Sequence, residues 1–459
     1  MRKQRITSAD LLRAIKQKSS STLIPNPVLP VTNQIILDDF EFEGSNTAIF
    51  NDCIFVGTFT IYGNEFYNDF TFKRCYFVKG VHLIDVKTSN LILLMDCKVR
   101  VNIVISGCKI NRLATYGTYI EHILIGTSTV TKLELGGKFQ SYIKRASVLD
   151  DNSIDKIQIS NCQIEEISFN YLSDNTEIFN CNINSLHFNK VRNNGNLKLL
   201  NCKSLSLKNK MSHFISNESN LGKAEFFQFD FSSFDEVNII NSVLNDCLFI
   251  NTIWSDNIKG FSGDQMDNYF KDRQLYNKPF TRAIYKFIKS EPMLFYKENK
   301  QQLNDKREVY KQIKYALSKQ GDTINEHLFH RLEMNTYNKS LDFKNVKNWG
   351  TKTILYLSSL TSNYGQSLRR PFFGLIFINA LLYFLMVSIF NYEGYEISVN
   401  HISWSSTTNA FAEFIRLVNP LHRNEPELRG WLLIIDIIIR IWSSYMIYNL
   451  VRASRRFIK

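Results

Sequence analysis

Three patterns of apolar and polar residues follow one another along the chain. From 36 to 255, short stretches alternate apolar and polar positions between Asn, Asp or Gly residues, which is typical of strands and turns. From 256 to 370 the apolar spacing becomes helical, and charged residues are frequent. Two later segments, 371–390 and 431–451, are almost uniformly apolar. We therefore predict a multidomain chain with a strand-rich domain, a helical connector and two apolar helices.

The strand-rich part repeats itself. Its cysteines recur in similar contexts, such as NDCIF, KRCYF and MDCKV, and Cys53, Cys75 and Cys97 are 22 residues apart. A coil of this length cannot bury its apolar face alone, so successive coils must stack, with like residues above like. This pattern predicts a β-solenoid over 36–255.

The cysteines of this domain have three conceivable roles: core packing, metal binding or disulfide formation. The sequence contains no CxxC motif, and a small apolar thiol suits a repeated core position. We expect reduced, buried cysteines and a reducing compartment. The eight are Cys53, Cys75, Cys97, Cys108, Cys162, Cys181, Cys202 and Cys247.

The segment from Ile36 to Trp254 resembles the pentapeptide-repeat and related right-handed β-helix proteins, although a strict five-residue A(D/N)Lxx rhythm does not hold. The resemblance implies a right-handed solenoid whose extended faces are able to bind a protein partner. Residues 1–35 precede it as a basic arm and a proline-containing linker. The arm lacks an apolar stretch of the kind found in signal peptides, so we expect no secretory signal.

The connector, 256–370, contains two helical patterns, 299–319 and 323–338, which we expect to form a hairpin. In the second, His327, His330 and Glu333 have spacings that occur among metal ligands. Successive members of this series rotate away from a common helix face, so we expect a polar face there and no metal site.

The end of the connector carries a second resemblance. The strings YKQIKYALSKQGDTINEHLFHRLEMNTY and SNYGQSLRRPF are similar to those of bacterial membrane proteins with a pentapeptide-repeat-like domain and a C-terminal two-helix, ion-channel-like region. This resemblance covers about 310–459 and implies an integral membrane protein. The matching residues are Gln320, Gly321, Asp322, Glu333, Asn363, Gly365, Arg370 and Pro371.

Each apolar segment is long enough to span a bilayer, because about 20 helical residues cross the hydrocarbon core. The positive-inside rule then places both termini and the tail 452–459 in the cytoplasm, and the loop 391–430 outside. A bacterial inner membrane follows as the expected location. The basic residues expected at the membrane surface are Arg369, Arg370, Arg452, Arg455 and Arg456.

The second apolar segment carries a charged pair, Asp436 and Arg440, at a spacing of i and i+4, followed by Ser443 and Ser444. A charge at a helix centre costs about 2.5–3.5 kcal/mol on insertion scales, so this stripe has to face protein or water. Two spans per chain provide little protein, which predicts a homo-oligomer. The stripe either lines a water-filled pore or forms an ion pair that fixes helix packing.

The loop contains a further helical pattern at 405–418, which lies flat at the interface or enters the bilayer as a re-entrant helix. The residues that define this pattern and its end are Phe411, Glu413, Phe414, Arg416, Asn419 and Pro420.

The sequence has no motif of a known enzyme class, and we expect no catalysis and no cofactor.

The formal net charge of +12 favours an anionic partner, for which the inner leaflet is a better candidate than nucleic acid, because no module combines aromatic with basic residues. We therefore expect an oligomeric membrane channel or pore-forming effector with a cytoplasmic solenoid for sensing or assembly. The alternative is a membrane-tethered scaffold whose solenoid recruits a protein partner, with the helices acting only as an anchor.

Overall fold

The computed structural model forms two compact units, residues 1–297 and 298–459. The residues that it describes are 4–7, 9–10, 13, 29–42, 48–63, 65–66, 69–149, 152–205, 207, 210–255, 258–260, 299–342, 346–390, 404–422 and 430–454.

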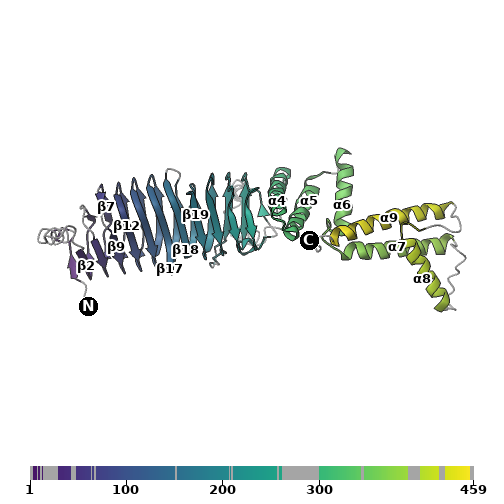
Figure 1. Ribbon diagram of the computed structural model, residues 1–459, viewed down its shortest axis with the longest axis horizontal. Coiled ribbons are helices and arrows are strands. Elements are labelled where there is room, and N and C mark those ends of the chain that lie inside the picture. The colour runs from purple at the N-terminus through teal and green to yellow at the C-terminus, as the bar shows by residue number, and fades with distance from the viewer. Residues whose placement is uncertain are drawn as a thin grey trace, which may run out of the picture. The chain divides into compact units, whose positions relative to one another are not determined.

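The first unit is a β-solenoid, as predicted, with strands stacked as successive coils (Figure 1). Strand pairs among the described residues are parallel, and they join positions about one coil apart: Tyr76 pairs with Ile54 on one side and Lys98 on the other. The strands are β1 (Gln4–Ile6), β2 (Leu29–Thr32), β3 (Gln34–Ile36), β4 (Phe40–Phe42), β5 (Ala48–Asn51), β6 (Ile54–Phe55), β7 (Phe59–Tyr62), β8 (Glu65–Phe66), β9 (Phe70–Lys73), β10 (Tyr76–Phe77), β11 (Gly80–Ile84), β12 (Lys87–Met95), β13 (Lys98–Val99), β14 (Asn102–Ser106), β15 (Lys109–Tyr116), β16 (Tyr119–Gly126), β17 (Thr129–Val148), β18 (Ser153–Phe169), β19 (Asn175–Phe179), β20 (Asn182–Asn189), β21 (Asn196–Leu200), β22 (His213–Asn217), β23 (Glu225–Phe227), β24 (Glu236–Ile240), β25 (Leu248–Ile250) and β26 (Ile258–Lys259), with a short 3-10 helix, η1 (Phe231–Ser233).

The repeated cysteine context has a backbone cause. The residue before most cysteines adopts a left-handed conformation that turns the chain at a corner of the coil, with φ of 57° at Asp52 and 54° at Asn180. Asn, Asp and Gly tolerate this region better than other residues do, so the same residue types recur at each corner. The cysteine that follows points inward, where it is buried and forms no disulfide, as predicted.

The core is a stack of apolar side chains in register. Phe50 lies above Phe72 with ring centroids 5.2 Å apart, and Phe55 lies above Phe77 at 4.8 Å. Burial raises the pKa of the Cys247 thiol to about 12, so this cysteine stays protonated and unreactive in the folded coil. Each coil is therefore covered by its neighbours.

The ladder extends beyond both predicted ends of the domain. β1, β2 and the first two residues of β3 lie in the range 1–35, which we expected to be an arm and linker, and β26 lies just beyond residue 255. Pro30 pairs with Ile49 in β2, which has β5 as its one partner among the described strands, so a missing N–H group is tolerated there. Asn33 (φ 55°) then makes the same left-handed corner as the later coils. Most of the remaining arm, including 14–28, lies outside the described residues.

The second unit is helical. The predicted hairpin forms from α4 and α5, and its caps follow the sequence: Asn299 makes a capping box with Gln302, Gly321 is left-handed, and the Asp322 side chain accepts from Asn325 N. The elements are α4 (Lys300–Gln320), α5 (Thr323–Ser340), η3 (Val346–Asn348), α6 (Trp349–Ser362), α7 (Arg369–Phe390), α8 (Trp404–Val418) and α9 (Trp431–Ser454).

Helices α7 and α9 lie side by side and antiparallel (Figure 1). Trp442 Nε1 donates to Gly374 O at 3.1 Å near one end of the pair, and Met386 packs with Ile435 and Ile439 near the other. Both helices are long and apolar enough to cross a bilayer, as their sequences predicted. Many of their apolar side chains remain exposed, among them Phe377 and Ile441.

Candidate functional site

The predicted charged pair is formed on α9. Asp436 and Arg440 are one helical turn apart, and Arg440 Nε donates to Asp436 Oδ2 at 2.8 Å. The Asp436 side chain is only 1% exposed, whereas that of Arg440 is 32% exposed. One member of the pair is therefore enclosed by the protein, and the other reaches its surface.

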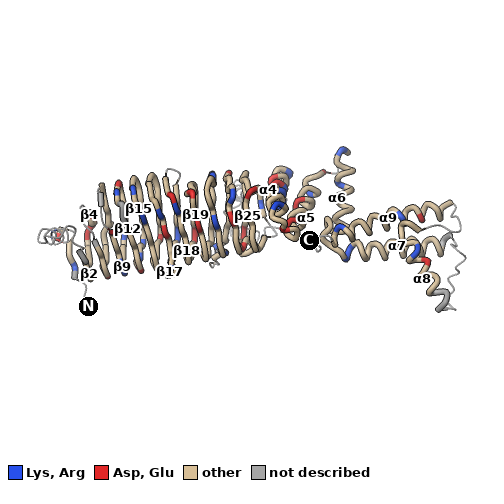
Figure 2. Tube along the Cα trace, in the orientation of Figure 1, with Lys and Arg blue, Asp and Glu red and all other residues tan. Residues whose placement is uncertain are grey.

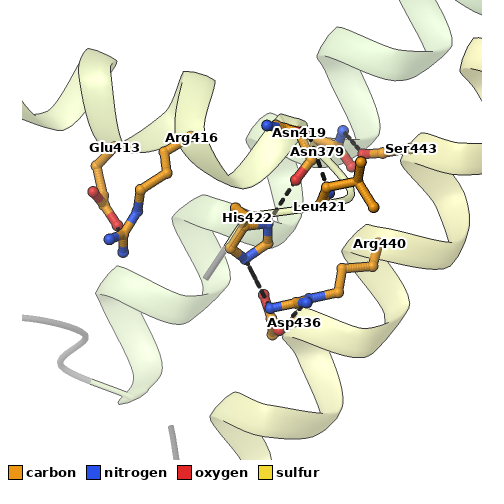
Figure 3. A network of polar contacts seen from close by, with 9 residues as sticks. All are labelled: Asn379, Glu413, Arg416, Asn419, Leu421, His422, Asp436, Arg440 and Ser443. Carbon is orange, nitrogen blue, oxygen red and sulfur yellow. Dashed lines mark hydrogen bonds and ion pairs between the residues drawn. The ribbon is translucent and has the colours of Figure 1, made fainter. Parts of the chain in front are cut away.

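A histidine from the loop completes this pair. His422 Nε2 lies 2.7 Å from Asp436 Oδ1, and His422 Nδ1 lies 2.7 Å from the backbone oxygen of Asn419 (Figure 3). The imidazole is as deeply buried as the carboxylate that it contacts, with 1% of its side chain exposed. The three side chains form a polar cluster, which we call the His–Asp–Arg cluster.

The end of α8 positions His422. Pro420 cannot continue the helix with a backbone donor, and Asn419 Oδ1 accepts from Leu421 N at 3.1 Å. Asn419 O accepts from His422 N at 3.1 Å, which closes a tight turn. This turn aims the imidazole at α9, so the Asn–Pro pair that we expected to end the helix also positions the histidine.

The contacts of His422 join both members of the ion pair. Asn419 O is an acceptor, so His422 Nδ1 donates to it. His422 Nε2 lies 2.7 Å from Asp436 Oδ1 and 3.4 Å from Arg440 Nη2. The imidazole is therefore held between the turn after α8 and the ion pair on α9.

Helix α8 occupies the range predicted for the loop helix and covers one side of the cluster. Its Leu417 is buried among Met386, Ile435 and Ile439, and Phe414 packs on Tyr383 with ring centroids 6.1 Å apart. Glu413 forms an ion pair with Arg416 along the helix. The apolar side chains of Phe411 and Ile415, on the outer side of the helix, are 64% and 51% exposed.

The predicted polar stripe on α9 divides into a buried and an exposed part. Ser443 is fully buried and accepts from Asn379 Nδ2 of α7 at 2.8 Å, whereas Ser444 is exposed. Ser444 lies with the exposed part of Arg440 in an open hollow of about 490 Å³. This hollow is lined by Arg440, Ile441, Ser444, Tyr445 and Tyr448.

The basic residues expected at the membrane surface contact other helices of this unit. Arg370 Nη1 donates to Ser359 O of α6 at 3.0 Å, and Arg452 Nη2 lies 3.1 Å from His330 Nε2 of α5. Burial, reinforced by the charge of Arg452, lowers the pKa of His330 to about 4, so its imidazole is neutral at pH 7 and accepts from the guanidinium. Arg369 begins α7, and Arg455 and Arg456 lie outside the described residues.

Two site residues were missed from the sequence. Asn379 interrupts a run of apolar residues, and a polar residue in a spanning segment is a signal that could have identified it. His422 has no such signal, because it lies in a loop and its partner is in another helix.

Comparison of the chain with protein-family models, curated proteins and solved structures found no match.

Proposed function

We propose that this chain is a non-enzymatic membrane protein that assembles as a homo-oligomer and conducts ions or small solutes between its α9 helices. The observation that carries this proposal is the exposed part of Arg440, which lies beside Ser444 and Tyr448 on a helix whose other exposed side chains are apolar. Such a polar strip is unfavourable against lipid, so it needs water or a second copy of the chain. A ring of α9 helices would provide both.

The position of Arg440 along the helix supports this proposal. It lies nine residues after Trp431, the first residue of α9, which corresponds to about 14 Å at about 1.5 Å per residue. The hydrocarbon core is about 30 Å thick, so a span that starts at Trp431 would carry the guanidinium near the bilayer midplane. Snorkelling to a headgroup is difficult from that depth.

Helix α8 supports a re-entrant segment by the same reasoning. Leu417 packs on Ile439, which lies eight residues or about 12 Å into α9, so the end of α8 would lie below the membrane surface. Its outer side chains, Phe411 and Ile415, are apolar and exposed, as lipid contact requires. In this arrangement α8 and the turn at Asn419–Pro420 form the outer mouth of the pathway.

The solenoid and the α4–α5 hairpin would then form a cytoplasmic sensing or assembly region. The basic flanks of the two spans support a multi-pass inner-membrane protein with both termini in the cytoplasm. Free, buried cysteines fit a reducing compartment. This organisation agrees with the resemblance to pentapeptide-repeat-like proteins that end in a two-helix, ion-channel-like region.

Reconstitution in liposomes tests the proposal. We expect ion flux from the purified chain, and a reduction of at least tenfold for Ser444→Leu, which removes an exposed polar group without touching the buried cluster. Ile437→Leu, an exposed apolar exchange on the same helix, is the matched control and should leave flux unchanged. Absence of flux together with a monomeric mass in detergent would contradict the proposal.

One observation favours the alternative, a membrane-tethered scaffold. His422 satisfies the Asp436 carboxylate within a single chain, so the buried part of the pair needs no second subunit. A scaffold predicts that an unrelated two-helix anchor in place of α7–α9 preserves recruitment of the solenoid's partner to the membrane. A channel predicts that the same exchange abolishes flux.

A further inference from the structure

The outer surface of the solenoid has a hollow of about 370 Å³ that the repeat pattern does not require. It lies on the coils formed by β17, β18, β20 and the start of β22, in a unit other than the one that holds the His–Asp–Arg cluster. The inference drawn from it does not depend on the membrane proposal. The hollow is lined by Lys144, Arg145, Glu165, Glu166, Asn184, Ser185, Lys210, Met211 and His213.

A change in side-chain size within one ladder creates the hollow. Arg145 pairs with Glu166 in the next coil, Glu166 pairs with Ser185, and Ser185 pairs with His213. At equivalent positions of four successive coils, Ser185 is thus the one small side chain among three large polar ones, and its size leaves a gap in the row. Charged residues recur along the solenoid (Figure 2), and at this coil Asn184 and Ser185 replace them.

A longer coil forms one wall of the gap. Ser185 and His213 are 28 residues apart, whereas Glu166 and Ser185 are 19 apart. The additional residues bring Lys210 and Met211 to the rim, where Lys210 pairs with Glu165. The hollow therefore has a polar floor, a wall of paired charges and a wall supplied by an insertion.

Asn184 in this floor has an acceptor without a partner. Its Nδ2 donates to Met211 O and to Ser185 Oγ, both at 3.3 Å, which fixes the orientation of the amide because the reverse orientation would put two oxygens face to face. Its Oδ1 is buried and has no hydrogen-bond partner among the described residues. Asn184 itself is 4% exposed. A buried acceptor of this kind favours a ligand with an N–H donor.

The walls present both signs of charge. Arg145 donates to Glu166 through Nε at 2.9 Å, which leaves its terminal nitrogens able to bind a carboxylate. The ammonium groups of Lys144 and Lys210 also line the hollow and pair with Glu121 and Glu165. Burial alone would raise the pKa of Glu165, but hydrogen bonds from Lys210 and Tyr142 outweigh it and lower that pKa, so Glu165 remains a carboxylate. Glu165 and Glu166 favour a cation nearby and disfavour a polyanion such as a nucleotide.

We propose that this hollow binds a small zwitterion that carries a free ammonium and a free carboxylate group, either a free amino acid or a short peptide. The ammonium group lies near the two glutamates and beside the buried amide of Asn184. The carboxylate lies against Arg145 and Lys210. The lining holds no Phe, Tyr or Trp ring on which a nucleobase could stack.

Titration calorimetry of the full chain in detergent tests this proposal, with trialanine, its N-acetylated form, its C-terminal amide, free alanine and AMP as probes. We expect trialanine or free alanine to bind, and each blocked peptide to bind at least tenfold more weakly than trialanine. Stronger binding of trialanine identifies a peptide site, and stronger binding of alanine identifies an amino-acid site. Binding of AMP alone, or of none of the probes, would overturn the proposal.

Variants locate the binding in the hollow. Asn184→Ala and Arg145→Gln should each weaken binding at least tenfold, whereas Lys198→Ala should not, because Lys198 forms a similar ladder pair with Glu225 elsewhere on the solenoid. Asn184→Ala also removes the contact with Met211, so Arg145→Gln, which is more exposed, provides an independent result. Unchanged binding in both variants would exclude this site. Protection of the buried cysteines from a thiol reagent confirms that each variant is folded.

Discussion

The two units of this chain place ion pairs in opposite environments. The solenoid holds them on its outside in rows across successive coils, such as Arg145–Glu166, whose side chains are 54% and 39% exposed. The helical unit encloses the Asp436 carboxylate of its Asp436–Arg440 pair together with His422. These two side chains are each 1% exposed. Exposed pairs contribute about 0–1 kcal/mol, whereas a buried charge that loses its partner costs several. Charged side chains therefore contribute little to the stability of the solenoid surface, whereas in the helical unit they determine how the helices pack.

The units also differ in how their stability is distributed. In the solenoid most contacts join one coil to the next, and stability is spread over many similar contacts. In the helical unit a few contacts, such as Asn379–Ser443 and His422–Asp436, join residues far apart in the sequence. All eight cysteines lie in the solenoid, and four of the five tryptophans lie in the helical unit. Thiol labelling and tryptophan fluorescence can therefore follow the two units separately.

The largest expected effect comes from breaking the buried pair. Asp436→Leu leaves Arg440 without its counter-charge and His422 Nε2 without its buried partner, so we expect a loss of about 3–5 kcal/mol in the free energy of unfolding of the helical unit. Tryptophan fluorescence during denaturation in detergent measures this loss. The matched control is Glu225→Leu in β23, which removes the exposed partner of Lys198 and should cost the solenoid at most about 1 kcal/mol, as measured by labelling of its buried thiols. Equal losses in the two variants would contradict the contrast between the units.

A smaller effect is expected at a corner of the solenoid. Asn180 is left-handed, and alanine in this region costs about 1–2 kcal/mol, so Asn180→Ala should lower the unfolding free energy by that amount. The rate at which the buried thiols become labelled in mild denaturant reports the change. Asn175→Ala, in strand β19, is the control and should have a lesser effect. If the buried thiols of both variants were labelled at the same rate, the left-handed conformation at this corner would not be the reason that asparagine is favourable there.

The smallest expected effect depends on pH. The folded pKa of His330 is about 4, below the ordinary value of about 6.5, so between these values the unfolded chain binds a proton that the folded chain does not. Stability of the helical unit should therefore fall as the pH falls from 6.5 to 4. In His330→Gln, which keeps an acceptor for Arg452, this part of the slope should disappear. Denaturation midpoints from tryptophan fluorescence at pH 7 and pH 4.5 test it, and an unchanged slope in the variant would rule out His330 as its source.

The solenoid was predictable because its physical rule is local and repeated. A corner residue such as Asn180 adopts a conformation that few residue types tolerate, and the cysteine after it faces the core, so Asn, Asp or Gly followed by cysteine recurs at many corners. The boundaries were less predictable, since β1, β2 and β3 are short and β2 contains Pro30, a residue type that is uncommon inside sheets. Departures from the repeat, such as the gap at Asn184, depend on the size of residues in neighbouring coils.

The sequence by itself determined the two kinds of region, the inward-facing cysteines, the α4–α5 hairpin, the two long apolar helices and the Asp436–Arg440 pair, because each depends on residues within one coil or a few helical turns. Only the tertiary structure decided that His422 completes this pair, that Ser443 is buried against Asn379, and that Ser444 is exposed. These outcomes depend on which helix faces are in contact and on the tight turn after α8. Such contacts join residues from different elements, and no periodicity along the chain encodes them.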